Sequence, residues 1–368
     1  MQLLLLATLV YISLAGTEGY NFRFQESQEA DTFAEFIDGE TTIIALSGDP
    51  QFWFPCAYSN EDCFREVGCR RGEGNATCET AQSEWANRVQ KKSILELHKK
   101  LQTAHRAKGL DGLIINGDLT NFGHLEELDR YEETWSTLEP GLKVYPGLGN
   151  HDYANNVDDC LLNFCVGRML RWYRNNVWSR SDLKCDLRQE DGDDLFSFSK
   201  KYVGSLGYSW NSDNGQDSYH LIQLNNYPTY ARNIDVKFPP EDWAITSSLG
   251  WLRRDLQEYR NKSVIINFHD SDNEFGEADK REFRRVLDES QAHILGIFFA
   301  HIHRRVGLKE LWCINGRSVP LIYSGSVPGT NYVSLHLKRG QIEGIYQCHV
   351  KNDQETEVRR VELPVNEC

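Results

Sequence analysis

Five short hydrophobic runs in this chain are each followed closely by a residue whose side chain can bind a metal ion. The longer stretches between them repeat hydrophobic residues at spacings of three and four, which is the period of a helix. Strands that alternate with helices are typical of an α/β fold, in which ligands bind beyond the carboxyl ends of the strands. The strands are expected at residues 42–46, 113–116, 143–146, 264–268 and 294–300.

Two segments interrupt this alternation. One is Cys-rich and covers residues 52–80, and the other, at 154–217, is rich in Trp, Tyr, Arg and acidic residues. Such insertions tend to lie over the functional end of the sheet. A length of 368 residues fits two average domains or one large one. We expect one domain over residues 17–368 that carries both insertions, with helices at residues 83–108, 125–137, 249–259 and 280–287.

The beginning of the chain predicts export. Residues 3–15 form an uncharged, mostly apolar run that is too short to span a bilayer and ends in Ser13-Leu14-Ala15, a small-x-small cleavage pattern. Because no Lys or Arg precedes this run, a buried first helix is the alternative to a cleaved signal peptide over residues 1–16. No later run reaches the roughly 18 apolar residues of a membrane span. We therefore expect a secreted protein with no transmembrane segment, or a lysosomal one.

Ten cysteines agree with an oxidising compartment, in which up to five disulfides would form. No CxxC pair is present, which disfavours a zinc finger. Asn75 and Asn261 each begin an N-x-S/T sequon in a polar stretch, and we expect both to be glycosylated. The first four cysteines are expected to pair among themselves, and these are Cys56, Cys63, Cys69 and Cys78.

The charge balance limits the partners of the protein. Lys and Arg number 40 against 54 Asp and Glu, so the formal net charge at pH 7 is −14. Because proteins that bind nucleic acid carry a basic surface, no nucleic-acid-binding patch is expected. We also expect the protein to be a monomer. A phosphate-bearing substrate would need cations that the chain itself does not supply.

The residues at the strand ends combine nitrogen and oxygen ligands and include no thiolate. Side chains two residues apart in an extended segment point to the same side. Asp49 and Gln51 can therefore bind the same ion, and so can His301 and His303. Such a set suits Zn, Fe or Mn rather than Cu(I) or an iron–sulfur cluster. The complete set of candidate ligands is Asp49, Gln51, Asp118, Asn150, His269, His301 and His303.

The stretches around these residues resemble, in order, the five motifs of the calcineurin-like metallophosphoesterase superfamily. The resemblance covers residues 42–335, apart from the two insertions. Asp49-Pro50-Gln51 resembles a branch of the superfamily in which Gln replaces the usual His of the first motif. The matching stretches are Gly48-Asp49-x-Gln51, Gly117-Asp118, Gly149-Asn150-His151-Asp152, Asn267-Phe268-His269 and Ala300-His301-x-His303.

The resemblance implies both a fold and a reaction. The fold is an αββα sandwich of two stacked β-sheets flanked by helices, in which strands at residues 332–337 and 341–346 would complete the second sheet. The reaction is hydrolysis of phosphate mono- or diesters by direct attack of metal-bound hydroxide on phosphorus. Two divalent ions against the charges of Asp49 and Asp118 would leave a net positive centre, which attracts a phosphoryl group even to an acidic protein.

The resemblance also implies a role for each matching residue. Asp118 would bridge two divalent ions, which could be Mn, Zn or Fe. His151 would lie at the substrate phosphate as general acid or electrostatic stabiliser, and Asp152 would orient it. The other ligands divide between the ions, with Asp49, Gln51 and His303 at the first and Asn150, His269 and His301 at the second.

Gln51 leaves two alternatives open, because it is either a ligand or a spectator beside the site. It also favours a different function, that of a secreted, non-catalytic binding protein that kept the phosphoesterase scaffold. The intact Asn150-His151-Asp152 disfavours this function. Other hydrolase classes have no support, since the chain contains no GxSxG, GxxxxGK or HExxH motif.

Several residues outside the motifs have less specific interpretations. Trp172, Tyr173 and Trp178 lie in the second insertion, where they could line a substrate mouth or pack locally. Four further histidines are expected to be structural, namely His220, His293, His336 and His349.

Overall fold

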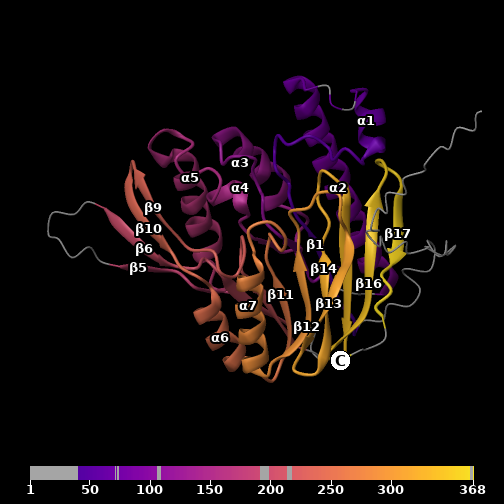
Figure 1. Cartoon of the computed structure of the whole chain (residues 1–368). Helices are drawn as coiled ribbons and strands as arrows, with labels where there is room; N and C mark the ends of the chain where they lie inside the picture. The colour runs from indigo at the N-terminus through magenta and orange to yellow at the C-terminus, as the bar shows by residue number, and fades with distance from the viewer. Residues whose placement is uncertain are drawn as a thin grey trace, which may run out of the picture.

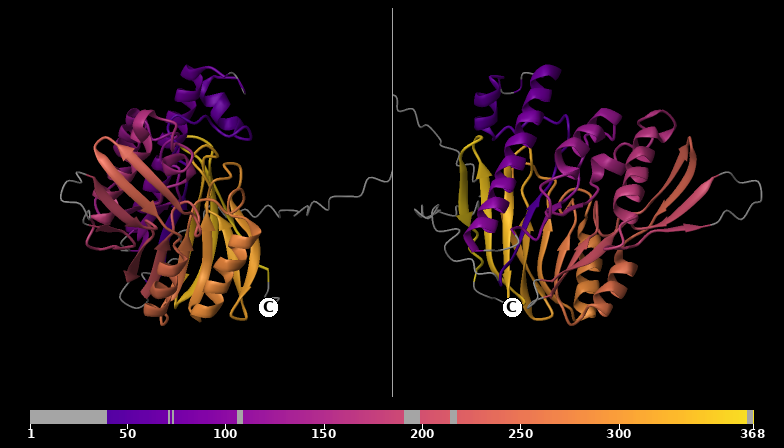
Figure 2. Two further views of the ribbon diagram at one scale, coloured as in Figure 1. Left: turned by 60° about the vertical axis from the view of Figure 1, so that its left-hand side comes forward. Right: turned by 180° about the vertical axis from the view of Figure 1, so that it is seen from behind.

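The computed structural model describes residues 40–70, 72, 74–105, 109–190, 199–213, 218–364 and 368. Two β-sheets stack face to face, with helices on both outer faces (Figures 1 and 2). The main hydrophobic core contains side chains from both sheets, such as Leu113, Phe298 and Val333. The predicted αββα sandwich is confirmed.

The first sheet has six strands in the order β17-β16-β15-β1-β2-β3. Its first three strands in the chain run parallel, and β1 also pairs antiparallel with β15. Every residue of β1 and β2 is buried, which explains why both read as unbroken hydrophobic runs in the sequence. The strands are β1 (Thr42–Ser47), β2 (Gly112–Ile115), β3 (Val144–Pro146), β15 (Asn331–Lys338), β16 (Gln341–Val350) and β17 (Thr356–Arg360).

The second sheet has seven strands in the order β13-β14-β12-β11-β8-β7-β4. Its central four strands run parallel, and an antiparallel strand adjoins them at either side. The strands are β4 (Lys184–Cys185), β7 (Tyr208–Asp213), β8 (Ser218–Gln223), β11 (Ser263–Asn267), β12 (His293–Phe299), β13 (Gly307–Ile314) and β14 (Arg317–Tyr323).

The segment at residues 154–217 contributes to two places in the fold. Its β5 (Arg188–Glu190) and β6 (Lys200–Gly204) join β9 (Arg232–Lys237) and β10 (Pro240–Ile245) in a separate four-stranded sheet, seen at the left of Figure 1. Its β4 and β7 instead extend the seven-stranded sheet of the sandwich. The segment is therefore partly built into the sandwich.

Helices cover the outer faces of both sheets. The long α2 (Ala76–His105) packs on the six-stranded sheet, and Leu252 of α6 and Phe283 of α7 form a second core under the seven-stranded sheet. The start of α2 precedes the predicted one because Asn75 Oδ1 accepts hydrogen bonds from the backbone N–H of Thr77 and Cys78. The other helical elements are α1 (Glu61–Val67), α3 (Leu125–Tyr131), η1 (Glu132–Ser136), α4 (Asn150–Tyr153), η2 (Leu161–Asn163), α5 (Phe164–Tyr173), η3 (Arg174–Trp178), α6 (Leu249–Glu258) and α7 (Glu277–Ser290).

Three disulfides occur in the described part of the chain. Cys56–Cys63 and Cys69–Cys78 confirm that the first four cysteines pair among themselves, and the third is Cys160–Cys165. The other four cysteines have free thiols. Among the described helices, none has the length and hydrophobicity that crossing a membrane requires. The predicted signal peptide, residues 1–16, lies outside the described residues.

Candidate metal centre

The carboxyl ends of β1, β2, β11 and β12 bring candidate ligands from both sheets to one place. Two groups form there, and in each group one ligand atom from every residue lies within 4.8 Å of the others. The first group is Asp49, Asp118 and His303, and the second is Asp118, His269 and His301. Asp118 belongs to both, which is the arrangement that a carboxylate bridging two ions would need.

In the second group, three ligand atoms converge on Nε2 of His269. Asn150 Oδ1 lies 2.9 Å from this nitrogen, Asp118 Oδ2 3.1 Å and His301 Nδ1 3.2 Å. The other ring nitrogen of His269, Nδ1, donates a hydrogen bond of 2.7 Å to the backbone oxygen of Asn116, which fixes the ring and directs Nε2 to the centre. The four residues are therefore held as a group that could bind one cation.

Electrostatics in this group favour a positive charge. His269 is fully buried, which alone would lower its pKa, but the adjacent Asp118 carboxylate raises the pKa to about 10. The pKa of Asp118 is lowered, because His269 and His151 outweigh the opposing effect of burial. A divalent ion between these side chains would likewise be stabilised by the Asp118 carboxylate.

Buried oxygen atoms without hydrogen-bond partners lie in the first group and beside it. Both carboxylate oxygens of Asp49 and Oε1 of Gln51 are in this state, although His303 Nε2 lies 3.3 Å from Asp49 Oδ1. Burying an unpaired carboxylate costs several kcal/mol, so such an arrangement persists where a cation compensates it. The donor set therefore fits a metal ion between Asp49, Asp118 and His303.

Four of the candidate ligands have a left-handed backbone, which is uncommon for residues other than glycine. Such a conformation costs about 1–3 kcal/mol per residue and clusters at functional sites. The φ angles are 54° at Asp49, 34° at Gln51, 51° at Asp118 and 67° at His301.

The glycines of the motifs leave room for the ligands. A Cβ on Gly117 would lie 2.6 Å from His269 Nδ1, and a Cβ on Gly149 would lie 2.2 Å from Asp118 Oδ1. A Cβ on Gly48 would lie 2.3 Å from the side chain of Ala300. These contacts are too short for any side chain. The ligands can therefore come this close together only with glycine at these positions.

His151 lies beside the bridging carboxylate. Its backbone N–H donates a hydrogen bond of 2.9 Å to Asp118 Oδ1, and its ring Nδ1 donates one of 2.7 Å to the backbone oxygen of Asn121. The ring is partly exposed and meets Phe122 edge-on at 5.6 Å. The Asn121 carbonyl thus fixes the orientation of the His151 ring through Nδ1.

Asp152 has different partners from those expected. Instead of the His151 ring, its carboxylate accepts hydrogen bonds of 2.8–3.0 Å from the backbone N–H of Leu119, Thr120 and Gly149 and from the Thr120 hydroxyl. Burial, with the nearby Asp118 charge, raises the pKa of Asp152 to about 7. Asp152 therefore joins the loops that carry Asp118 and Asn150, and the orientation of His151 comes from Asn121.

Sequence reasoning missed two asparagines in this centre. Asn121 also accepts a hydrogen bond of 3.3 Å from Gln51 Nε2 on its side-chain oxygen, and Asn273 Nδ2 lies 2.5 Å from His301 Nε2. Both lie in loops after a ligand, where an asparagine reads equally well as a turn residue. Only the folded chain distinguishes the two roles.

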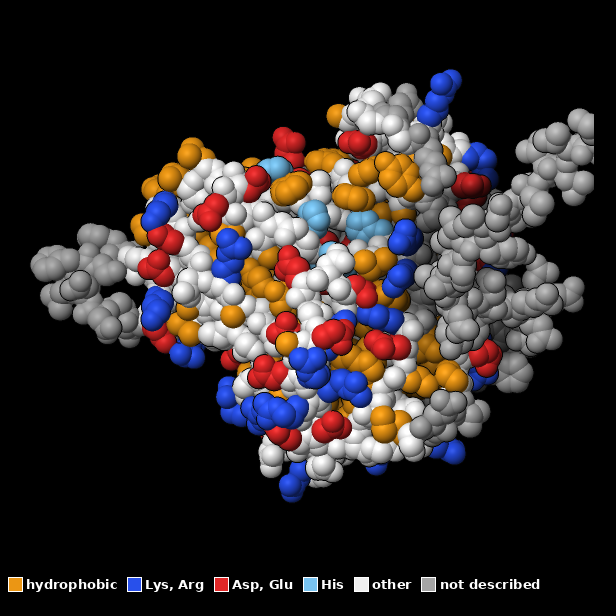
Figure 3. Space-filling view, viewed as in Figure 1, with side chains coloured by type: hydrophobic (Ala, Val, Ile, Leu, Met, Phe, Trp, Pro, Cys, Tyr) orange, Lys and Arg blue, Asp and Glu red, His pale blue; other side chains and the backbone are white. Residues whose placement is uncertain are grey.

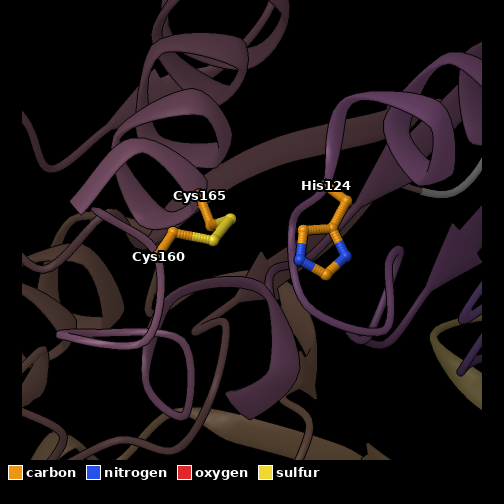
Figure 4. Close-up of side chains that lie close together, drawn as sticks. All are labelled: His124, Cys160 and Cys165. Carbon is orange, nitrogen blue, oxygen red and sulfur yellow. A yellow bond between two sulfur atoms is a disulfide. The ribbon is translucent and has the colours of Figure 1, made fainter. Parts of the chain in front are cut away.

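A further group of possible ligands lies outside the centre. His124, Cys160 and Cys165 come close together (Figure 4), but the two cysteines form a disulfide and offer no thiolate. His124 Nδ1 is 2.9 Å from Glu127 Oε1. These residues are not in a state to bind a metal.

The remaining residues of interest serve packing. Trp172 and Tyr173 are buried, and Trp178 contacts the Tyr202 ring edge-on at 6.3 Å, so these aromatics belong to the core. The buried His220 lies 2.7 Å from Asp255 Oδ2. Asn75 and Asn261, the predicted glycosylation residues, are both exposed.

Comparisons with known proteins identify one family model and several solved structures of low sequence identity. The family model described as calcineurin-like phosphoesterase matches residues 44–305. No curated protein matches the chain. Among solved structures, PhoD is 9% identical with a TM-score of 0.46, over 88% of this chain and 69% of that one. The calcineurin-like phosphoesterase YfkN from Bacillus subtilis is 12% identical with a TM-score of 0.39, over 87% and 90% of the two chains. TT1561 of Thermus thermophilus is 10% identical with a TM-score of 0.41, over 88% and 100%.

Proposed function

The chain belongs to the calcineurin-like phosphoesterase family, and from this membership we propose that it is a dinuclear, metal-dependent hydrolase of phosphate mono- or diesters. The observation that carries the proposal is Asp118, which is shared by the two groups of ligand atoms. The unpartnered oxygens of Asp49 and Gln51 support a cation in the first group.

We propose that the candidate ligands divide between two ions. Asp49, Gln51, Asp118 and His303 would hold the first, and Asp118, Asn150, His269 and His301 the second. When bound, two such ions supply positive charge for the phosphoryl group and a water that is acidic enough to act as a nucleophile near neutral pH. Imidazole, carboxylate and amide ligands suit Mn, Zn or Fe.

His151 would supply the proton in this reaction. Its Nδ1 is held by the Asn121 carbonyl, so Nε2 can donate to the leaving oxygen or stabilise charge on the phosphoryl group. Asn121 is a positioning residue in this scheme, and Asp152 keeps the Asp118 and Asn150 loops together.

The experiment that tests the proposal combines metal content with turnover. The purified protein is saturated with Mn, Zn or Fe(II), analysed for bound metal, and assayed on p-nitrophenyl phosphate and on bis(p-nitrophenyl) phosphate. We expect two bound equivalents and turnover of at least one ester. Two bound ions without turnover of either ester would overturn the proposal in favour of a binding protein that kept the scaffold.

We further propose that the protein acts outside the cell as a monomer. Three disulfides are compatible with an oxidising compartment, and Asn75 and Asn261 are exposed as a glycan requires. Expression of the full chain in animal cells should place it in the medium, with a mass that falls on treatment with a glycosidase. Retention in the cytosol without glycans would contradict this location.

A further inference from the structure

A pocket of about 580 Å³ adjoins the metal centre. His301 and His303 form one end of it, and the Cys-rich segment of residues 52–80 forms most of the remaining wall. Figure 3 shows histidine side chains in pale blue at the surface, with hydrophobic side chains in orange beside them. A substrate whose phosphoryl group lies at the centre would therefore extend its organic part toward this pocket.

The wall of the pocket includes three aromatic side chains among small, apolar and polar ones. Phe54, Tyr58 and Phe64 line it, and the Phe54 ring meets the His303 ring edge-on at 4.7 Å. Tyr58 is 65% exposed, so its ring is within reach of a ligand in the pocket. The charged side chains of the wall, Glu79 and Arg304, have opposite signs. They therefore favour neither an anionic nor a cationic ligand group.

A buried acceptor also lies in the wall. Gln82 is 3% exposed, and its Oε1 has no hydrogen-bond partner. Leaving a buried acceptor unpaired costs about 1–3 kcal/mol. A ligand that brings a donor to Gln82 would recover this free energy, so the pocket is prepared for a group that is apolar but not purely hydrocarbon.

Cross-links and hydrogen bonds hold the described part of the wall in place. Two disulfides, Cys56–Cys63 and Cys69–Cys78, cross-link the Cys-rich segment. Its backbone is attached to the loop between β14 and β15, because Ala57 N–H donates to the Pro328 oxygen at 2.9 Å and Asn60 Nδ2 donates to the same oxygen at 3.1 Å. A preformed pocket binds with less loss of conformational entropy.

We propose that this pocket binds the organic part of the substrate, and that this part is a flat aromatic group carrying a hydrogen-bond donor. The proposal rests on the proposed function. Aromatic rings pack edge-on or offset against such a wall. An acyl chain would leave Gln82 unpaired.

The test uses three phosphate esters whose leaving alcohols are similar in acidity: 3-aminobenzyl, benzyl and cyclohexylmethyl phosphate. Each is assayed with the metal-loaded protein as the monoester and as the methyl diester. We expect kcat/KM to fall at least threefold at each step from 3-aminobenzyl to benzyl to cyclohexylmethyl. Equal kcat/KM for the three esters would overturn the proposal.

Variants assign the preference to the wall. Tyr58→Ala should bring the benzyl and cyclohexylmethyl esters to similar kcat/KM, and Gln82→Leu should remove the preference for the 3-amino group, both mainly through KM. Phe238→Ala is the matched control, because Phe238 is 64% exposed and lies between β9 and β10, outside the pocket lining. Preferences that persist unchanged in both wall variants would also overturn the proposal.

A binding measurement separates this proposal from the function itself. Calorimetry with the three corresponding phosphonates, which cannot be hydrolysed at the ester position, reports the preference of the pocket without turnover. If none of the esters is hydrolysed but the phosphonates keep the predicted order, the proposed reaction fails and the pocket assignment holds. If methyl phosphate is hydrolysed but the phosphonates bind equally, the reaction stands and the pocket assignment fails.

Discussion

Asp118 is the one residue whose carboxylate takes part in both groups of ligands. Asp118→Asn keeps the size of the side chain but removes the charge that would hold two ions. We expect hydrolysis to fall by several orders of magnitude while the far-UV circular dichroism and Tm stay close to wild type. The exposed Asp129→Asn is the control. If the Asp118 variant kept more than about a tenth of the activity, a difference of only ~1.4 kcal/mol in the barrier, the bridging assignment would be wrong.

His151 should act on the leaving group and not on metal affinity. Because its ring bonds to Asn121 and not to another candidate ligand, His151→Ala should leave metal content unchanged. General acid catalysis is worth about 10²–10⁴ in rate, and the loss should be largest for esters with poor leaving groups. His349→Ala, at a partly exposed histidine that is not among the candidate ligands, is the control. An equal loss on good and poor leaving groups would remove the acid role.

Gln51 should make the first ion the weaker of the two. An amide oxygen is a poorer ligand for Zn or Fe(II) than an imidazole nitrogen and better matched to Mn. We expect the purified protein to contain fewer than two equivalents of metal and to gain activity with added Mn. Gln51→His should raise the occupancy and reduce that gain, as measured by elemental analysis and by activity against added Mn. Full occupancy of the wild type without any response to Mn would contradict this.

The elements that carry the ligands depend on close approaches of their connecting loops. Gly149→Ala would place a Cβ 2.2 Å from Asp118 Oδ1 and 2.4 Å from the Asp118 backbone nitrogen, so one of the two loops must move. We expect metal affinity to drop at least tenfold, with the secondary structure retained. Gly250→Ala in α6 is the matched control, because its nearest atom lies at 3.9 Å and alanine favours a helix. Metal affinity equal to wild type in Gly149→Ala would show that the loops adjust freely.

Much of the element pattern could be predicted from the sequence. β1, β2, β11 and β12 are buried on both faces, and such strands read as short, continuous hydrophobic runs. β8 was not predicted, since its buried His220, paired with Asp255, breaks the hydrophobic pattern. β14 was missed as well, because Pro320 within it reads as a strand breaker.

The candidate ligands could be located from the sequence, but the backbone conformation and the hydrogen bonds that hold them in place could not. Asp118 and His269 follow predicted strands closely, and this position alone was enough to predict them as ligands. The left-handed backbone at Asp49 and His301 and the hydrogen bonds of Asn121 result from packing between segments far apart in the chain. No local pattern encodes such interactions.

At the scale of the whole molecule, the end of the chain returns to the seven-stranded sheet. Ser318 pairs with Cys313 across β13 and β14, and Ser318 Oγ lies 3.5 Å from Cys368 Sγ. Cys368 also forms a hydrogen bond with the Cys313 thiol, which raises the pKa of that thiol. The two sulfur atoms are therefore close together. We expect these two cysteines to form a fourth disulfide under oxidising conditions. Peptide mapping without reduction should find Cys313 joined to Cys368, and Cys368→Ser should lower Tm. Cys185 and Cys348 serve as internal controls and should remain thiols, and free thiols at Cys313 and Cys368 would contradict the prediction.

Asn121 sets a fixed dimension for the reacting part of the site. Its side-chain oxygen accepts from Gln51 Nε2, its backbone oxygen accepts from the His151 ring, and its backbone N–H donates to the Phe52 oxygen. One amino acid therefore connects the Gln51 side chain with the His151 ring, so packing sets the separation of these two side chains. In the proposed reaction, variation among substrates would be accommodated in the part of the substrate that extends away from the phosphoryl group.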